Sequence, residues 1–273
     1  MAVAPGLWLP ECCLCPNPLI FHDFISMTLK AILLGFNGTL IDTEPLHRAL
    51  MTALMADQGL PLRSGEYEGW CLGRSDREAL TNLWAGRRQW LHPALLDKLV
   101  NLKAQRYRQA LTSQDPLPLF PDAADFLFRL RLEQFKLALV TRGQRWEVDW
   151  VLEQSQWHPY FAALVTGEDI EQGKPDPEGY GLAIDRLNAA YPHLQLQPQH
   201  CLAVEDTHAG FEAAHQAGLA VVGVAHTLPL HLVQRRVEWG VDRLVDLEID
   251  RVKATFALQD LGTMSRAVVP PHQ

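Results

Sequence analysis

Short apolar runs recur along the chain, and each one ends at a polar or glycine-containing turn. The first run occupies residues 31–36 and stops at Asn37. Because these runs are continuous and not alternating, they predict strands of a sheet that is covered on both faces. The other runs lie at residues 136–141, 201–204 and 220–225, with weaker ones at 163–166 and 244–245.

Helical spacing of apolar residues separates these runs. The alternation of strand and helix predicts right-handed crossovers and a parallel sheet. We therefore expect an α/β fold with a Rossmann-like, doubly wound parallel core built from residues 27–43 and 118–258. The predicted helices lie at residues 122–133, 145–154, 176–189 and 207–216.

Residues 44–117 carry leucines at helical spacing and no convincing strand. This stretch predicts an all-helical cap domain inserted after the first strand. Such an insertion lies over the carboxyl ends of the strands, where ligands bind in sheets of this type. Residues 259–273 are predicted to form a loosely held tail.

Composition narrows the classes of function. The 273 residues are 48% hydrophobic and 21% charged, with a net charge of −8. No run of lysine and arginine occurs, which argues against a nucleic-acid partner. No apolar stretch is long enough for a membrane span. A phosphate ligand would therefore depend on a local site and not on the overall field.

Five cysteines occur, three of them clustered at Cys12, Cys13 and Cys15. An odd, clustered set does not resemble a disulfide framework and favours reduced thiols in the cytoplasm. For residues 1–26 we favour a start codon assigned too early, since Met27 stands just before the first strand; a disordered leader is the alternative. Metal binding by the three cysteines is less favoured, because a structural zinc site needs four ligands.

Four polar segments each follow a predicted strand, at residues 35–43, 141–143, 173–177 and 205–207. Taken singly, they read as a turn, a helix N-cap, a helix-starting loop and an acidic helix N-terminus. Together they bring a hydroxyl, a lysine and two carboxylates to one edge of a parallel sheet. That combination is typical of a site for phosphate and Mg²⁺.

The stretches NGTLIDTEPLH, GKPDPEGY and VEDTHAGFEAAHQAG resemble those of the haloacid dehalogenase superfamily. The resemblance is greatest to the branch of the phosphoglycolate phosphatases and beta-phosphoglucomutases, and it runs from about residue 29 to 256. It implies that the helical insertion is that branch's cap. It also implies that the stretch LGRSD, residues 72–76, reads the substrate.

The resemblance also implies roles for individual residues around a small phosphorylated metabolite. Glu205 and Asp206 would bind Mg²⁺. Arg74 would reach the distal end of the substrate, although an exposed cap arginine is the alternative. Lys174 would also screen charge during catalysis. The residues implied in phosphate binding are Gly38, Thr141, Arg142 and Lys174.

The first segment departs from the family pattern, which is Asp-x-Asp-Gly-Thr. Gly35 replaces the aspartate that attacks phosphorus and binds the metal, and Asn37 replaces the acid/base aspartate. The backbone carbonyl of Asn37 would still be able to contact the metal. Loss of a covalent nucleophile costs roughly 10³- to 10⁶-fold in rate.

These observations favour a protein of this fold that binds a phosphorylated metabolite, with phosphatase activity weak or lost. One alternative is an active Mg²⁺-dependent phosphatase or phosphomutase. Another is a regulatory or scaffolding pseudoenzyme that binds a protein partner. Chemistry on a phosphonate or a haloacid is the weakest hypothesis, because the resembling families also need an aspartate at position 35.

Overall fold

The computed structural model describes residues 29–72 and 74–267. Six parallel strands form one sheet in the order β3-β2-β1-β4-β5-β6. In the register, Leu34 at the end of β1 lies beside Leu139 of β2 and Val204 of β4. The carboxyl ends of these three central strands therefore meet at one edge. The strands are β1 (Ala31–Leu34), β2 (Lys136–Val140), β3 (Phe161–Val165), β4 (Cys201–Glu205), β5 (Ala220–Val224) and β6 (Trp239–Val241).

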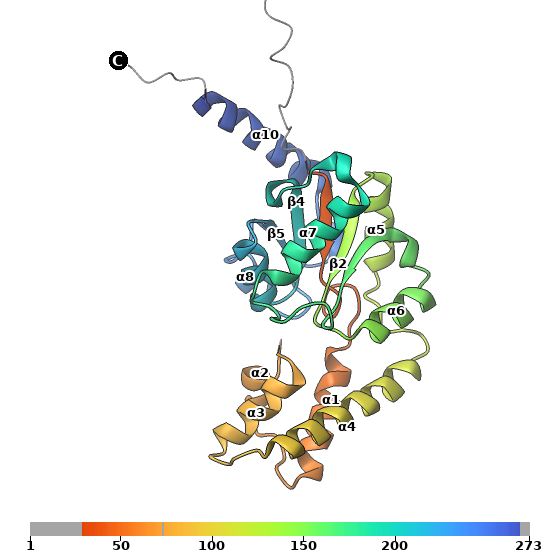
Figure 1. Ribbon diagram of the computed structural model, residues 1–273, viewed down its shortest axis with the longest axis vertical. Helices are drawn as coiled ribbons and strands as arrows, with labels where there is room; N and C mark the ends of the chain where they lie inside the picture. The colour runs from red at the N-terminus through yellow and green to blue at the C-terminus, as the bar shows by residue number, and fades with distance from the viewer. Residues whose placement is uncertain (1–28, 73, 268–273) are drawn as a thin grey trace, which may run out of the picture.

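Helices cover both faces of the sheet (Figure 1), as predicted for a doubly wound core. One face packs against α5 (Ala123–Leu132), α6 (Arg145–Gln154) and α10 (Ile249–Ala267). The other packs against α7 (Glu178–Ala190), α8 (His208–Gln216) and α9 (Leu230–Val233). Because side chains alternate along a strand, Ile32 and Leu34 face the first set while Ala31 and Leu33 face the second. Short 3₁₀ turns lie at His158–Tyr160, Pro192–Leu194, Pro198–His200 and Leu244–Asp246.

Four helices between β1 and α5 form the cap, which occupies the lower end of the molecule in Figure 1. They enclose a separate apolar core that includes Leu54, Leu80 and Leu99. The helix α10 extends from the opposite end of the sheet. The cap therefore lies at the carboxyl edge of the strands, opposite the end from which α10 extends. The cap helices are α1 (Glu44–Asp57), α2 (Glu66–Trp70), α3 (Asp76–Gly86) and α4 (Pro93–Thr112).

The structure corrects one predicted strand, adds one that was not predicted and extends the last helix. Residues 244–245 were predicted as a weak strand, but Leu244 lies in a 3₁₀ turn, fully buried against the sheet. The sixth strand is β6, whose three residues make too short a pattern to detect in the sequence. The helix α10 continues through residues predicted as a tail. The leader, with Cys12, Cys13 and Cys15, lies outside the described residues.

No helix within residues 29–72 and 74–267 is both long and apolar enough to cross a membrane.

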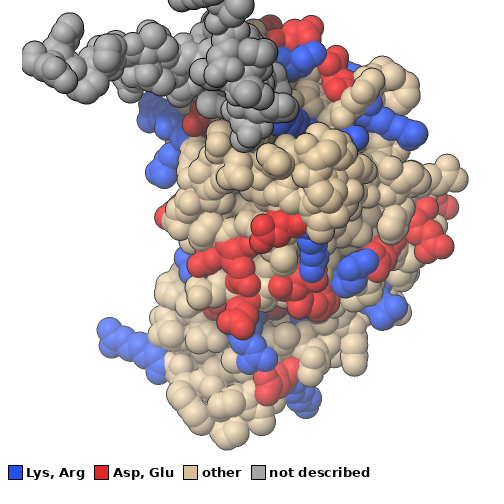
Figure 2. Space-filling model, turned by 45° about the horizontal axis from the view of Figure 1, so that its top comes forward, with Lys and Arg blue, Asp and Glu red and all other residues tan. Residues whose placement is uncertain are grey.

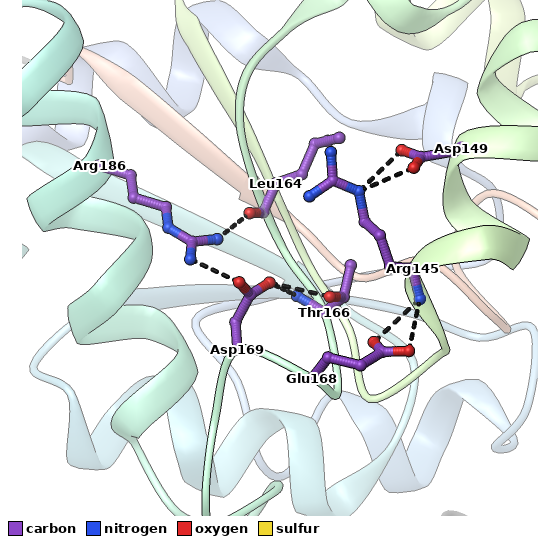
Figure 3. A network of polar contacts seen from close by, with 7 residues as sticks. All are labelled: Arg145, Asp149, Leu164, Thr166, Glu168, Asp169 and Arg186. Atoms are coloured by element: carbon purple, nitrogen blue, oxygen red, sulfur yellow. Dashed lines mark hydrogen bonds and ion pairs between the residues drawn. The ribbon is translucent and has the colours of Figure 1, made fainter.

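Ion pairs fix the loop that follows β3 (Figure 3). The Asp169 carboxylate accepts hydrogen bonds from the Thr166 backbone and hydroxyl, both at 2.8 Å, and pairs with Arg186 of α7 at 2.6 Å. The next contact links the loop to α6, because the backbone N–H of Arg145 donates to the Glu168 carboxylate at 2.9 Å. The loop after β3 is thus held by contacts to α7 on one side and α6 on the other.

We expect Asp169→Asn to destabilise the protein at neutral pH more than at low pH. The hydrogen bond from Arg186, and those from Thr166, hold the pKa of Asp169 well below its usual value of 3.8. A carboxyl group with a lowered folded-state pKa stabilises the fold above its unfolded pKa, and this stabilisation is lost as pH falls through the folded pKa. The expected loss at pH 7 is about 1–3 kcal/mol of unfolding free energy.

Urea unfolding at pH 7 and pH 2.5 would measure this effect. The control is Asp250→Asn, since the Asp250 side chain is 95% exposed and its ion pair contributes little. Equal losses for Asp169→Asn at the two pH values would contradict the prediction.

Candidate phosphate-binding site

A cavity of about 380 Å³ lies between the carboxyl edge of the sheet and the cap. Figure 2 shows acidic and basic residues gathered in a band where the α/β core meets the helical cap. Gly35 is buried and does not line the cavity. The structure brings the other predicted site residues to its wall: Asn37, Gly38, Arg74, Thr141, Arg142, Lys174, Glu205 and Asp206.

A tight turn after β1 brings the first motif to the cavity. The Leu40 backbone N–H donates to the Phe36 carbonyl at 2.8 Å, and the backbone between them turns at Gly38, whose φ is +76°. That conformation favours glycine. A Cβ at Gly38 would also lie 2.0 Å from Oδ2 of Asp206. Glycine is therefore required here both for its dihedral angle and for the close approach of β1 to the acidic pair.

Gly35 has neighbours where a side chain would lie. A Cβ built on Gly35 would be 2.6 Å from Oγ1 of Thr39 and 3.2 Å from Oε1 of Glu205. Thr39 is fully buried, and its hydroxyl donates to Oδ1 of Asp206 at 3.3 Å. The space that an aspartate would need at position 35 is thus partly filled by the Thr39 side chain.

Lys174 forms a partly buried ion pair with Glu205. Its ammonium group contacts Oε1 of Glu205 and donates to the Val140 carbonyl at 2.9 Å. The Tyr180 hydroxyl donates to the same oxygen of Glu205 at 2.5 Å. Burial, followed by the charge of Glu205, raises the pKa of Tyr180 well above its usual value, so this phenol stays protonated. Glu205 therefore accepts hydrogen bonds from two protein groups, Lys174 and Tyr180.

Asp206 is the second buried carboxylate of the site. Its Oδ2 accepts a hydrogen bond from the Thr227 hydroxyl at 2.5 Å, and its Oδ1 accepts one from Thr39. Burial, with the negative charge of Glu205 second, raises the pKa of Asp206 to about 7. The hydroxyls of Thr227 and Thr39 and the charge of Lys174 oppose this rise.

The side chains present fit Mg²⁺ poorly as they are arranged. Mg²⁺ needs six oxygen ligands at about 2.0–2.1 Å, commonly one or two carboxylates with water and phosphate oxygens. Gly35 offers no side chain, and both Glu205 and Asp206 already accept hydrogen bonds from protein groups. Within residues 29–72 and 74–267, no group of three or more His, Cys, Asp or Glu side chains gathers as a metal site.

Asn37 points its amide nitrogen at two acceptors. The Nδ2 atom donates to Oγ1 of Thr43 at 2.8 Å and to Oε1 of Glu147 at 2.7 Å. Its Oδ1 faces the Thr141 hydroxyl at 3.4 Å. Thr141 also accepts the Gly143 backbone N–H at 2.9 Å. The hydroxyl of the second motif therefore lies beside the amide of the first.

Glu147 is a site residue that the motif analysis did not identify. It occupies the first turn of α6, where acidic residues are common, so its sequence position carries no special signal. It is 3% exposed, and the Tyr107 hydroxyl of the cap donates to its Oε1 at 2.6 Å. Burial raises the pKa of Glu147, against the hydrogen bonds from Tyr107 and Asn37.

Basic residues line the cavity from both the sheet edge and the cap. Arg142 of the sheet edge donates to the Lys174 carbonyl at 3.3 Å and lies 3.6 Å from the Glu78 carboxylate of α3. Arg74 lines the cavity from the cap and is exposed. Arg142 is therefore placed to link the sheet edge to the cap.

Lys103 is another cavity residue that the motifs did not predict, because it lies within the helical pattern of α4. It is 2% exposed and pairs with Asp76 at 2.5 Å. Its ammonium donates to Nδ1 of His47 at 3.0 Å. Burial, and then the charge of Lys103, lowers the pKa of His47 to about 3, so this imidazole is a neutral acceptor.

Comparison with known proteins agrees with this architecture. A family model described as haloacid dehalogenase-like hydrolase matches residues 29–218. CbbY of Rhodobacter capsulatus is 29% identical over 72% of this chain and 85% of its own length. A phosphorylated carbohydrates phosphatase of Thermotoga maritima is 28% identical over 73% of this chain and 87% of its own.

A solved structure of CbbY from Rhodobacter sphaeroides in complex with xylulose-(1,5)bisphosphate has the same fold. It superposes with a TM-score of 0.69 at 23% identity and covers 81% of this chain and 96% of that one. With a family model that matches well over half of its length, this chain belongs to the haloacid dehalogenase-like hydrolases.

Proposed function

We propose that this protein binds a small phosphorylated metabolite in the cavity between sheet and cap, and hydrolyses phosphate esters slowly or not at all. Gly35 carries this proposal, because it supplies no nucleophile and the Thr39 hydroxyl lies 2.6 Å from its would-be Cβ. The two carboxylates of the fourth motif do not stand in for the missing one, since Glu205 and Asp206 are engaged with protein donors.

Binding of phosphate is supported by groups that the substitutions at 35 and 37 leave in place. Lys174, Arg142 and the Thr141 hydroxyl lie at one wall of the cavity, and Arg74 lies on the cap side. A small number of convergent polar groups in an enclosed cavity is typical of a small-molecule site. Absence of the aspartate also removes a negative charge that would repel phosphate. Mg²⁺ is expected to bind weakly, and we expect the protein to act in the cytoplasm.

The second candidate is an active phosphatase or phosphomutase. It is favoured by the retained Lys174, Thr141 and acidic pair and by similarity to relatives such as the phosphorylated carbohydrates phosphatase of Thermotoga maritima. It would need water to attack phosphorus without a covalent intermediate.

Assays of phosphate release separate these two candidates. With Mg²⁺ and a panel of phosphomonoesters, we expect a kcat for the native protein below about 0.01 s⁻¹. Typical enzymes reach about 10 s⁻¹, and a lost nucleophile costs about 10³-fold or more. Lys174→Ala is the matched background control. A native kcat of about 1 s⁻¹ or more, abolished in the control, would establish the active phosphatase instead.

Reintroducing the nucleophile gives the complementary measurement. We expect Gly35→Asp/Asn37→Asp to gain activity over the native protein, provided that the Thr39 side chain rotates away from the new Cβ and that Glu147 moves away from the new carboxylate at position 37. The single variant Gly35→Ala adds the Cβ without a carboxylate and serves as the control for the contact with Thr39. A double variant that folds, binds phosphate and still equals Gly35→Ala in rate would count against a site that lacks only its nucleophile.

Calorimetric titration with inorganic phosphate tests binding without any catalytic step. We expect Lys174→Ala to weaken binding by roughly 10- to 100-fold, since hydrogen bonds to charged groups contribute about 1.5–3 kcal/mol. Thr141→Val should weaken it by less than tenfold. Lys253→Ala is the matched control, because Lys253 pairs with Glu133 on the surface. Equal affinities for the Lys174 and Lys253 variants would exclude the proposed site.

A further inference from the structure

Glu147 contacts the first motif and the cap with the same oxygen atom. Its Oε1 accepts from Nδ2 of Asn37 at 2.7 Å and from the Tyr107 hydroxyl at 2.6 Å. Tyr107 is itself 5% exposed and stacks on His47 of α1, with ring centroids 4.3 Å apart. One buried carboxylate thus joins the turn after β1 to two cap helices.

This contact dictates the orientation of the Asn37 amide. A carboxylate oxygen only accepts hydrogen bonds, so the NH₂ group of Asn37 must face it. Its second N–H meets Oγ1 of Thr43 at 2.8 Å. The carbonyl oxygen is then left on the side of Thr141, at 3.4 Å from its hydroxyl. Both amide protons of Asn37 are therefore used to hold the side chain in place.

An aspartate at position 37 would not suit the same surroundings. It would place a carboxylate oxygen about 2.7 Å from Oε1 of Glu147, where the N–H of Asn37 now lies, so the two groups would repel unless one of them took up a proton. The Tyr107 hydroxyl has one proton and already donates it to Glu147. Like charges at this distance in a buried site repel strongly, because the local dielectric constant is low.

We propose that Glu147 is a positioning residue that holds Asn37 as an amide and excludes an aspartate from position 37. Asn37 and Glu147 form a matched pair, so the departure from the family pattern at position 37 is compensated by a group on α6. This inference rests on the proposed function only in that the protein works with an amide at this position.

A double-mutant cycle in the ligand-free protein tests the pair. Asn37→Asp should lower the Tm by several degrees in the native background. In the Glu147→Gln background the loss should shrink by at least about 2–4 °C, because the introduced glutamine amide can donate to the new carboxylate. Glu153→Gln, an exposed change on the same helix, is the matched control and should leave the loss unchanged.

Should Asn37→Asp fail to fold, a folded Asn37→Asp/Glu147→Gln variant would support the pairing equally. Losses of Tm that add up in the Glu147 cycle, as in the Glu153 cycle, would overturn it. The readout is thermal stability without phosphate, so its failure is distinct from a failure to bind phosphate.

The side-chain amide of Asn37 gives a spectroscopic readout of positioning. In ¹H–¹⁵N spectra, we expect its proton that faces Glu147 to exchange at least about tenfold faster in Glu147→Ala than in the native protein. Glu147→Gln should retain slow exchange, because its Oε1 still accepts. Fast exchange already in the native protein, or equal rates in native and Glu147→Ala, would contradict the assigned role.

Discussion

The burial of three carboxylates beneath one cavity is the constraint on which the site depends. Glu147, Glu205 and Asp206 are each no more than 3% exposed. A buried charge without partners costs several kcal/mol. Each of the three therefore needs donors, and the donors come from different elements: Lys174 and Tyr180 for Glu205, Thr39 and Thr227 for Asp206, and Tyr107 and Asn37 for Glu147. These contacts tie β1, β4, α6, α7 and the cap together around the cavity.

The same constraint explains how the fold accommodates a glycine at position 35. An aspartate there would add a fourth buried carboxylate, and such a site needs a metal cation to offset the charge. Without an aspartate at position 35, Lys174 pairs with Glu205, and the Thr39 hydroxyl donates a hydrogen bond to Asp206. The charges of the site are thus partnered by protein groups. The glycine at position 35 and the internal pairing of the acidic residues are consistent parts of one arrangement.

The fold was predictable from the sequence to a large extent, because buried parallel strands leave continuous apolar runs. The strands β1, β2, β4 and β5 were found within one or two residues at each end. The short β6 was missed, since three half-buried residues make no periodic signal. The convergence of the motif residues on one cavity was predictable for the same reason, since each motif follows a strand of the parallel sheet. The positions of Glu147 and Lys103 at the cavity could not be predicted from the sequence, because both residues lie within helices where acidic and basic residues are ordinary.

Membership of a hydrolase family does not by itself determine the side chains at positions 35 and 37, for a physical reason. The sheet, the turn at Gly38 and the cap depend on backbone hydrogen bonds and apolar packing, which a change at position 35 leaves intact. The family's catalysis depends on one side chain at that position and on the acid at position 37. Once Thr39 fills the space beside Gly35 and Glu147 engages Asn37, restoring the family's residues requires movement of both neighbours. The scaffold can therefore form with a glycine at position 35 and an asparagine at position 37.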